Sequence, residues 1–109
     1  MRKIFLKKSE TLIKKSEICL KLYKIILIKL DSLAPGEMSE EEVERYKKLF
    51  ECKINEAINV INTIKEDIQI VKKDTEISNI APSIKKINKI DKIYTKEIKK
   101  LENINYLLP

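Results

Sequence analysis

The sequence predicts an all-α protein, in which a long antiparallel helical hairpin and a shorter third helix form a three-helix bundle, or a four-helix bundle when copies associate. The 109 residues include only 1 Gly and 3 Pro, so long helices are seldom interrupted. Apolar residues recur at alternating three- and four-residue spacing in three tracts, which is the spacing of one helix face. We therefore expect a single helical domain over residues 1–109, with helices at about 4–33, 40–73 and 83–105.

The first tract predicts a helix with two apolar rows. One row has the heptad spacing and consists of Leu12, Ser16, Cys19, Tyr23, Ile26, Leu30 and Leu33. The second row lies beside it and consists of Ile13, Leu20 and Leu27. A helix with two adjacent apolar rows is expected to face two partners.

The break after the first tract predicts the bend of a hairpin. Pro35 disfavours helical geometry in the residue before it, and Gly36 can adopt a positive φ. Ser39 is placed to accept a hydrogen bond from the backbone N–H of Glu42, whose side chain can reach back to Ser39, as in a capping box. Helices joined by a short loop are antiparallel neighbours. The apolar pair expected to staple this cap is Met38 and Val43.

The second and third tracts each predict a helix with one main apolar row. The row of the second helix consists of Phe50, Ile54, Ala57, Ile61, Ile64, Ile68 and Val71, and that of the third of Ile84, Ile87, Tyr94, Ile98 and Leu101. Asp91 interrupts the third row, and Ile90 can take its place. The opposite face of the third helix is expected to be solvent-exposed and carries Lys85, Lys89, Lys92, Lys96 and Lys99. This helix should measure about 35 Å, against about 45–50 Å for the first two.

The net charge of +6 is distributed unevenly along the chain. Residues 1–33 and 82–109 are basic, whereas residues 34–81 are acidic. If the three segments pack side by side, the acidic one attracts its basic neighbours. The isoelectric point near 9.2 also favours a second interpretation, in which the lysine faces contact nucleic acid.

The composition argues against catalysis and metal binding. The chain has no His, and it contains no glycine-rich phosphate loop, so we expect no enzyme, no metal site and no cofactor. Cys19 and Cys52 lie at similar distances from the bend, but Cys52 is off the apolar row, so we expect two ordinary thiols of a reducing compartment. The most apolar tract, residues 18–30, is interrupted by lysines, and the N-terminus lacks a convincing signal peptide, so we expect a cytoplasmic protein without a membrane span.

The order, length and apolar spacing of the helices carry a family resemblance. A first helix with SETLIKKSEICLKLYKIILIKLDSL, a second with SEEEVERYKKLFECKINEAINVI and a shorter last one with IKKINKIDKIYTKEIKKLEN resemble the flagellar export chaperones of the FliT type and their FlgN-type relatives. The resemblance covers most of the chain. It implies a chaperone that binds the helical terminal segment of a filament-cap or junction protein and brings it to the export gate. Members of that family are often acidic, and this basic chain departs from that pattern.

The expected function is non-enzymatic protein binding. Because the third helix should be the shortest, part of the first two should stay uncovered, and we expect the partner-binding stripe beside Ile13, Leu20 and Leu27. An amphipathic helix of a partner, or of a second copy of the chain, would complete the bundle there. Two alternatives stay open: a basic helical subunit of a nucleic-acid-associated complex, and a purely structural homo-oligomeric coiled-coil protein.

Overall fold

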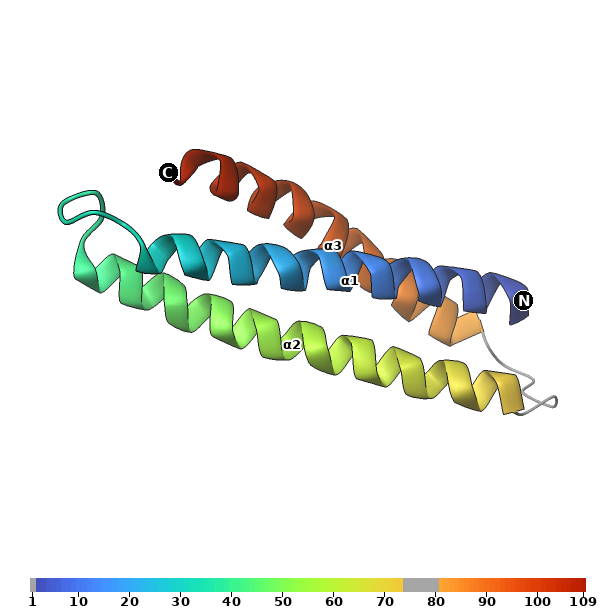
Figure 1. Cartoon of the computed structure of the whole chain (residues 1–109). Coiled ribbons are helices and arrows are strands. Elements are labelled where there is room, and N and C mark those ends of the chain that lie inside the picture. Colours follow the sequence, from blue (N-terminus) through green and yellow to red (C-terminus); the bar gives the residue numbers. More distant parts are fainter. Residues whose placement is uncertain (1, 74–80) are drawn as a thin grey trace.

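The computed structural model describes residues 2–73 and 81–109, and it confirms the all-α three-helix fold. The helices are α1 (Arg2–Asp31), α2 (Glu40–Lys73) and α3 (Ala81–Leu107), with α1 between the other two (Figure 1). They contain 30, 34 and 27 residues, which correspond to about 45, 51 and 40 Å. The sequence-based length of the third helix was therefore too short. Pro82 lies in its first turn, where a residue without an N–H breaks no helical hydrogen bond, so the helix begins before it.

The bend contains a β-turn built on proline and glycine. The Glu37 N–H donates to the Ala34 carbonyl at 3.2 Å, which places Pro35 and Gly36 at the two central positions. Gly36 has a φ of +91°, the conformation that the third residue of a type II turn requires. The chain must leave the helix before this turn, so α1 ends at Asp31, two residues before the predicted boundary.

Ser39 caps the start of α2, as predicted. Its Oγ accepts a hydrogen bond from the Glu42 N–H at 3.2 Å, and its carbonyl accepts one from the Val43 N–H at 3.0 Å. Met38 and Val43, the predicted staple pair, both pack against the hydrophobic core. The bend thus fixes where α2 begins and ties that point to the core.

The core is centred on α1. Its buried residues continue the predicted heptad row toward the N-terminus and are Phe5, Ser9, Leu12, Ser16, Cys19, Tyr23, Ile26 and Leu30. The predicted rows of the other two helices are also confirmed. α2 buries Phe50, Ala57, Ile61, Ile64, Ile68 and Val71, and α3 buries Ile87, Tyr94 and Leu101. Partly buried residues complete the rows, namely Leu33, Ile54, Ile84, Ile90 and Ile98.

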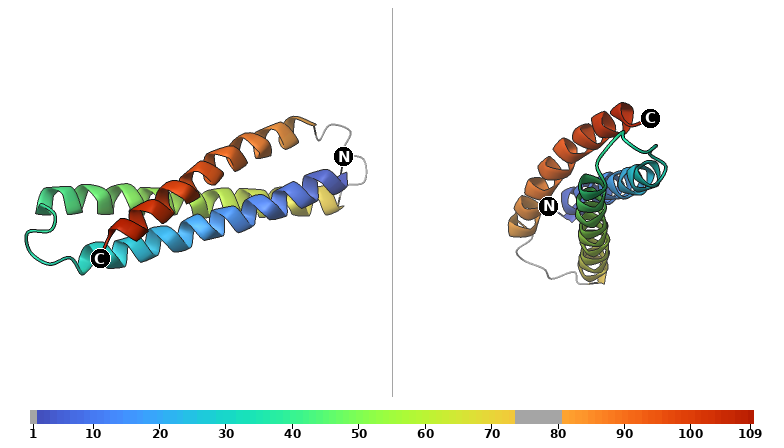
Figure 2. Two further views of the ribbon diagram at one scale, coloured as in Figure 1. Left: turned by 90° about the horizontal axis from the view of Figure 1, so that it is seen from above. Right: turned by 90° about the vertical axis from the view of Figure 1, so that its left-hand side faces the viewer.

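α2 and α3 both pack on α1, but they stay apart from each other. Among the described residues, no Cα atom of α2 lies within 8 Å of a Cα atom of α3. α3 instead runs obliquely over the hairpin (Figure 2). The bundle is therefore long and narrow, with extents of 60 × 19 × 16 Å, and it is open along the side where α2 and α3 would otherwise meet.

Polar contacts between two basic helices hold α3 on α1. Lys15 Nζ lies 2.7 Å from the Asp91 carboxylate and donates to Thr95 Oγ1 at 3.0 Å. Asp91 interrupts the apolar row of α3 because it pairs with this lysine. Lys8 and Lys29, each a multiple of seven residues from Lys15, donate to acceptors on α3 in the same way, Lys8 to Asn88 Oδ1 at 2.8 Å and Lys29 to the Asn105 carbonyl at 2.8 Å.

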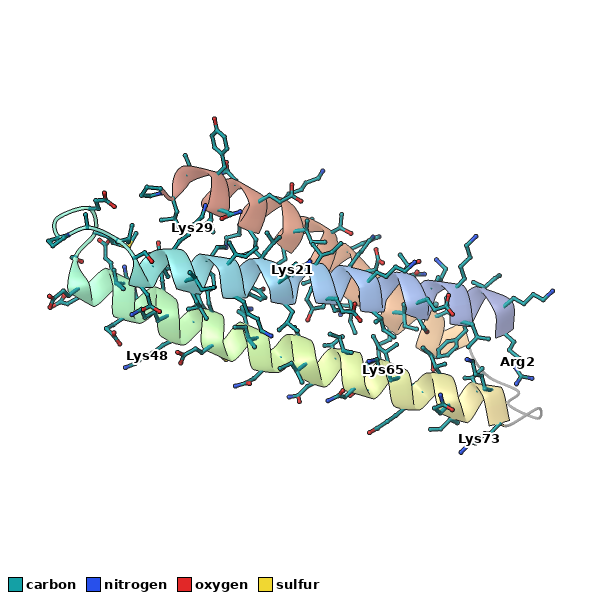
Figure 3. All side chains as sticks on the ribbon, in the orientation of Figure 1. Arg2, Lys21, Lys29, Lys48, Lys65 and Lys73 are labelled. Atoms are coloured by element: carbon teal, nitrogen blue, oxygen red, sulfur yellow. The ribbon has the colours of Figure 1, made fainter. Side chains whose placement is uncertain are left out.

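Single contacts fasten both ends of the hairpin. Lys47 of α2 pairs with Asp31 at the bend, and the Arg2 guanidinium donates to the Lys72 carbonyl at 2.8 Å at the other end. Figure 3 shows Arg2 beside the end of α2, and Lys29 between α1 and α3. The predicted lysine row on the opposite face of α3, Lys85 to Lys99, is solvent-exposed.

Replacing Ser39 by Ala should lower the free energy of unfolding by about 1 kcal/mol, because the substitution removes the N-cap of α2. Chemical denaturation measures this loss. Ser32→Ala is the matched control, since Ser32 is exposed and its Oγ only donates to the Ile28 carbonyl at the end of α1. It should change the free energy by less than about 0.5 kcal/mol. Equal effects of the two substitutions would contradict a capping role for Ser39.

Replacing Ile61 by Ala should cost about 2–5 kcal/mol, the range for truncating a buried isoleucine. Ile61 is only 7% exposed, whereas Ile58, one turn earlier on the same helix, is 38% exposed. Ile58→Ala makes the same chemical change and should cost clearly less. Denaturant melts that rank the two substitutions in the opposite order would show that α2 turns another face to α1.

Candidate partner-binding groove

A groove runs between α2 and α3, with α1 as its floor. Three hollows of about 270, 360 and 190 Å³ follow one another along it. α2 lines them with Tyr46, Phe50, Lys53, Glu56, Asn59, Val60, Thr63, Ile64 and Asp67, and α3 with Ser83, Lys86, Ile87, Ile90, Ile93, Tyr94, Glu97, Ile104 and Leu107. Tyr23, Ile26 and Leu30 of α1, together with Met38 and Leu108, complete the lining. We call this surface the α2–α3 groove.

The walls of the groove are second rows on α2 and α3, beside the rows that face α1. On α3 the row reads Lys86, Ile90, Ile93, Glu97, Lys100, Ile104 and Leu107, and on α2 it reads Leu49, Lys53, Glu56, Val60, Thr63 and Asp67. Both rows keep the alternating three- and four-residue spacing that places residues on one helix face. These rows can be seen in the sequence once the neighbours of each helix are known, but their charged members hide them from a search for apolar spacing.

Several large apolar side chains along this groove are exposed. On α3, Ile93 is 56% exposed and Leu107 is 70% exposed. On α2, Leu49, which lies one turn before Lys53, is 46% exposed. Single exposed apolar residues are common on protein surfaces, but a row of them beside a hollow is typical of an interaction site. The groove therefore has the shape and the side chains to receive an elongated apolar ridge.

The three residues predicted to bind a partner lie together on α1 but outside the hollows of this groove. Ile13, Leu20 and Leu27 are all half-buried, and Ile13 and Leu27 pack against the core. Each of the three directly follows a buried residue of the α1 row, whereas Lys15 and Lys29, which reach α3, directly precede one. The two sets therefore lie on opposite sides of the buried row. This places the stripe on the α2 side of α1. Its role in partner binding stays a prediction, and the α2–α3 groove is a second candidate.

The titratable groups beside the middle of the groove are held neutral. Burial, with a smaller contribution from the Glu97 carboxylate, raises the pKa of the Cys19 thiol to about 12. Burial also raises the pKa of Tyr94 to about 12, with smaller contributions from Cys19, Glu56 and Glu97. A thiol with so high a pKa is a poor nucleophile at neutral pH. Cys52 is exposed, and both cysteines are free thiols.

The other features of the described residues offer less to a ligand. A hollow of about 380 Å³ lies between α1 and α3, but the amino groups of Lys8 and Lys15 on its wall are already bonded to Asn88 and Asp91. Over residues 2–73 and 81–109, no three His, Cys, Asp or Glu side chains gather to hold a metal ion. Within the same ranges, no helix has the length and apolar character needed to cross a membrane.

We expect stability to fall as the pH rises above about 9. Cys19 and Tyr94 have ordinary pKa values of 9.0 and 10.0, and both rise to about 12 in the folded protein. The unfolded chain therefore releases these protons first, so the stabilisation is complete below pH 9 and is lost between about pH 9 and 12. Denaturant midpoints measured from pH 7 to 11 test this expectation. Cys19→Ala should move the onset of the decline upward, toward pH 10, and a midpoint independent of pH would contradict the burial of both groups.

Comparison with known proteins leaves the groove as the main guide to function. A scan against family models found no match, and searches of the curated proteins and of the solved structures found none either.

Proposed function

We propose that this chain is a non-enzymatic protein-interaction module that holds an amphipathic helix of another protein in the α2–α3 groove. The observation that carries the proposal is that α2 and α3 both pack on α1 while no Cα atoms of theirs approach within 8 Å among the described residues. The position of a fourth helix, opposite α1, is thus left open. A helix laid there would bury the second rows of α2 and α3 and complete a four-helix bundle.

The size of the groove supports a helical occupant. The groove row of α3 extends from Lys86 to Leu107, which is about 30 Å along the helix axis. A partner helix of about 20 residues has the same length. Such a helix docks through a ridge of apolar residues at positions i, i+3, i+4 and i+7, which matches the spacing of both walls.

The resemblance to flagellar export chaperones supplies a more specific form of this proposal. The partner would then be the helical terminal segment of a flagellar filament-cap or junction protein. The order of the helices and the two long arms of the hairpin support this form, and the basic charge of the chain counts against it. Such a chaperone works in the cytoplasm, and two free thiols fit that reducing compartment.

A nucleic-acid partner is the second candidate, and the exposed lysines of α3 favour it. Lys85, Lys89, Lys92, Lys96 and Lys99 form a continuous solvent-exposed row. Lys89 and Lys96 of this row lie one turn on either side of Ile93 at the edge of the groove, whereas Lys85, Lys92 and Lys99 face away from Ile90 and Ile93. The two candidates therefore use neighbouring surfaces, and an experiment that compares Lys92 with Ile93 distinguishes them.

Photocrosslinking in living cells provides that experiment. A benzoylphenylalanine residue placed at Ile93 should give a covalent adduct with another protein, because this position lies in the groove. The same residue at Lys92, one position earlier on an outward face, is the matched control and should give little adduct. Protein adducts from Lys92 alone would contradict the proposal. A nuclease-sensitive adduct from Lys92 would support the nucleic-acid candidate, and a product of twice the chain mass from Ile93 would support a structural homo-oligomer.

A further inference from the structure

The α2–α3 groove changes its chemical character along its length. The hollow nearest the bend is lined by apolar side chains, among them Phe50, Ile104 and Leu107. The middle hollow instead receives carboxylates from both walls, Glu56 from α2 and Glu97 from α3. A ligand that fills the whole groove must therefore satisfy an apolar end and an acidic centre.

The two carboxylates act on the same buried group. Glu56, Glu97 and Tyr94 line one hollow. Burial is the main cause of the raised pKa of Tyr94, and both carboxylates add to it. Burial likewise raises the pKa of Tyr23, and the Glu97 carboxylate adds to this effect. Glu97 thus lines the same hollow as Tyr23 of α1.

Glu97 forms no ion pair among the described residues, although Lys53 lines the same hollow and Lys100 lies one turn further along α3. Lys53 lies 3.5 Å from Glu56, so that carboxylate has a partner. Among the described residues, no lysine or arginine nitrogen comes within 4.0 Å of the Glu97 carboxylate. A docked helix would exclude water from this half-buried group, and covering an unpaired charge is costly unless the ligand supplies its counter-charge.

A second copy of the chain meets this requirement poorly. One exposed apolar ridge that a second copy offers is the outer face of α1, with Ile4, Ile18 and Ile25. The same ridge carries exposed Lys7, Lys14 and Lys21 at seven-residue spacing. Among the described residues, the groove carboxylates without a cation within 4.0 Å are Glu97 and Asp67, so three lysines laid along the groove would leave at least one buried without a partner.

We propose that the α2–α3 groove takes an amphipathic helix of a partner protein with a lysine or arginine in the middle of its apolar ridge, where the cation meets Glu97. This inference rests on the proposed function and specifies the partner's chemistry. Ile90 and Ile104 lie seven residues on either side of Glu97, about 10 Å away along α3. The partner helix should therefore carry apolar residues about two turns before and two turns after its cation.

A displayed library of amphipathic helices tests this inference on the intact protein. Each helix has about 22 residues, leucine along its ridge and three randomised central ridge positions. Helices selected for binding to the wild-type protein should be enriched in lysine or arginine at the centre of the ridge. Changing that residue to Gln in a selected helix should weaken binding about tenfold. Helices selected for binding to the Glu97→Gln variant should show no preference for a central lysine or arginine. Helices selected for binding to the Glu66→Gln variant, whose change lies on an exposed face of α2, should keep this preference.

The outcomes separate this inference from the proposed function. One outcome is that the selected helices bind the wild type without a preferred residue at the centre of the ridge, and do not bind the Ile93→Asp variant. This outcome would overturn the pairing of a central cation with Glu97 and would leave the proposed binding in the groove intact. Failure to enrich any helix would overturn both. Self-association that Ile93→Asp abolishes would assign the groove to a second copy and also overturn the inference. Because the Arg, Gln and Glu forms of one helix can be compared on the wild-type protein, the result does not depend on the folding of a Glu97 variant.

Discussion

The fold depends on one buried row of α1 that packs against two helices at once. The eight buried residues of α1 include the small residues Ser9, Ser16 and Cys19, all fully buried. Small side chains let neighbouring helices approach closely. Because α2 and α3 do not meet, each depends on α1 for its buried surface. Substitutions in this row should therefore weaken the packing of both α2 and α3. The same arrangement leaves the second rows of α2 and α3 uncovered.

Polar contacts then determine where α3 lies on α1. Apolar packing alone allows a helix to slide by a turn, since the rows repeat every few residues. Lys8, Lys15 and Lys29 reach specific acceptors along the length of α3, and a slide would break all of these contacts. These contacts also explain how two basic helices lie side by side. The Asp91 carboxylate neutralises the charge of Lys15, and neutral oxygens of Asn88 and Asn105 accept hydrogen bonds from Lys8 and Lys29.

Much of the fold could be predicted from the sequence because it is encoded locally. The cap at Ser39, the turn at Gly36 and the heptad rows each depend on residues within one or two turns of one another. The groove could not be predicted in the same way. Heptad spacing tells which residues share a face of one helix, but not which neighbour that face meets. The groove rows are interrupted by charged residues, among them Lys53, Glu56 and Glu97, so apolar spacing alone does not identify them. The sequence argument attributed open surface to the unequal lengths of the helices, whereas the structure attributes it to the separation of α2 from α3.

The central claim is that α1 is covered on two sides while the space between α2 and α3 stays open to solvent. Paramagnetic relaxation of methyl resonances by a soluble gadolinium chelate tests it most directly. Ile93 in the groove should relax strongly, since it is 56% exposed, whereas Ile26 and Leu101, both 0% exposed, should be protected. Nuclear Overhauser contacts should connect α1 to both other helices. Protection of Ile93 to the level of Leu101 in the monomeric protein would contradict the account, because it would mean that α2 and α3 close over the groove.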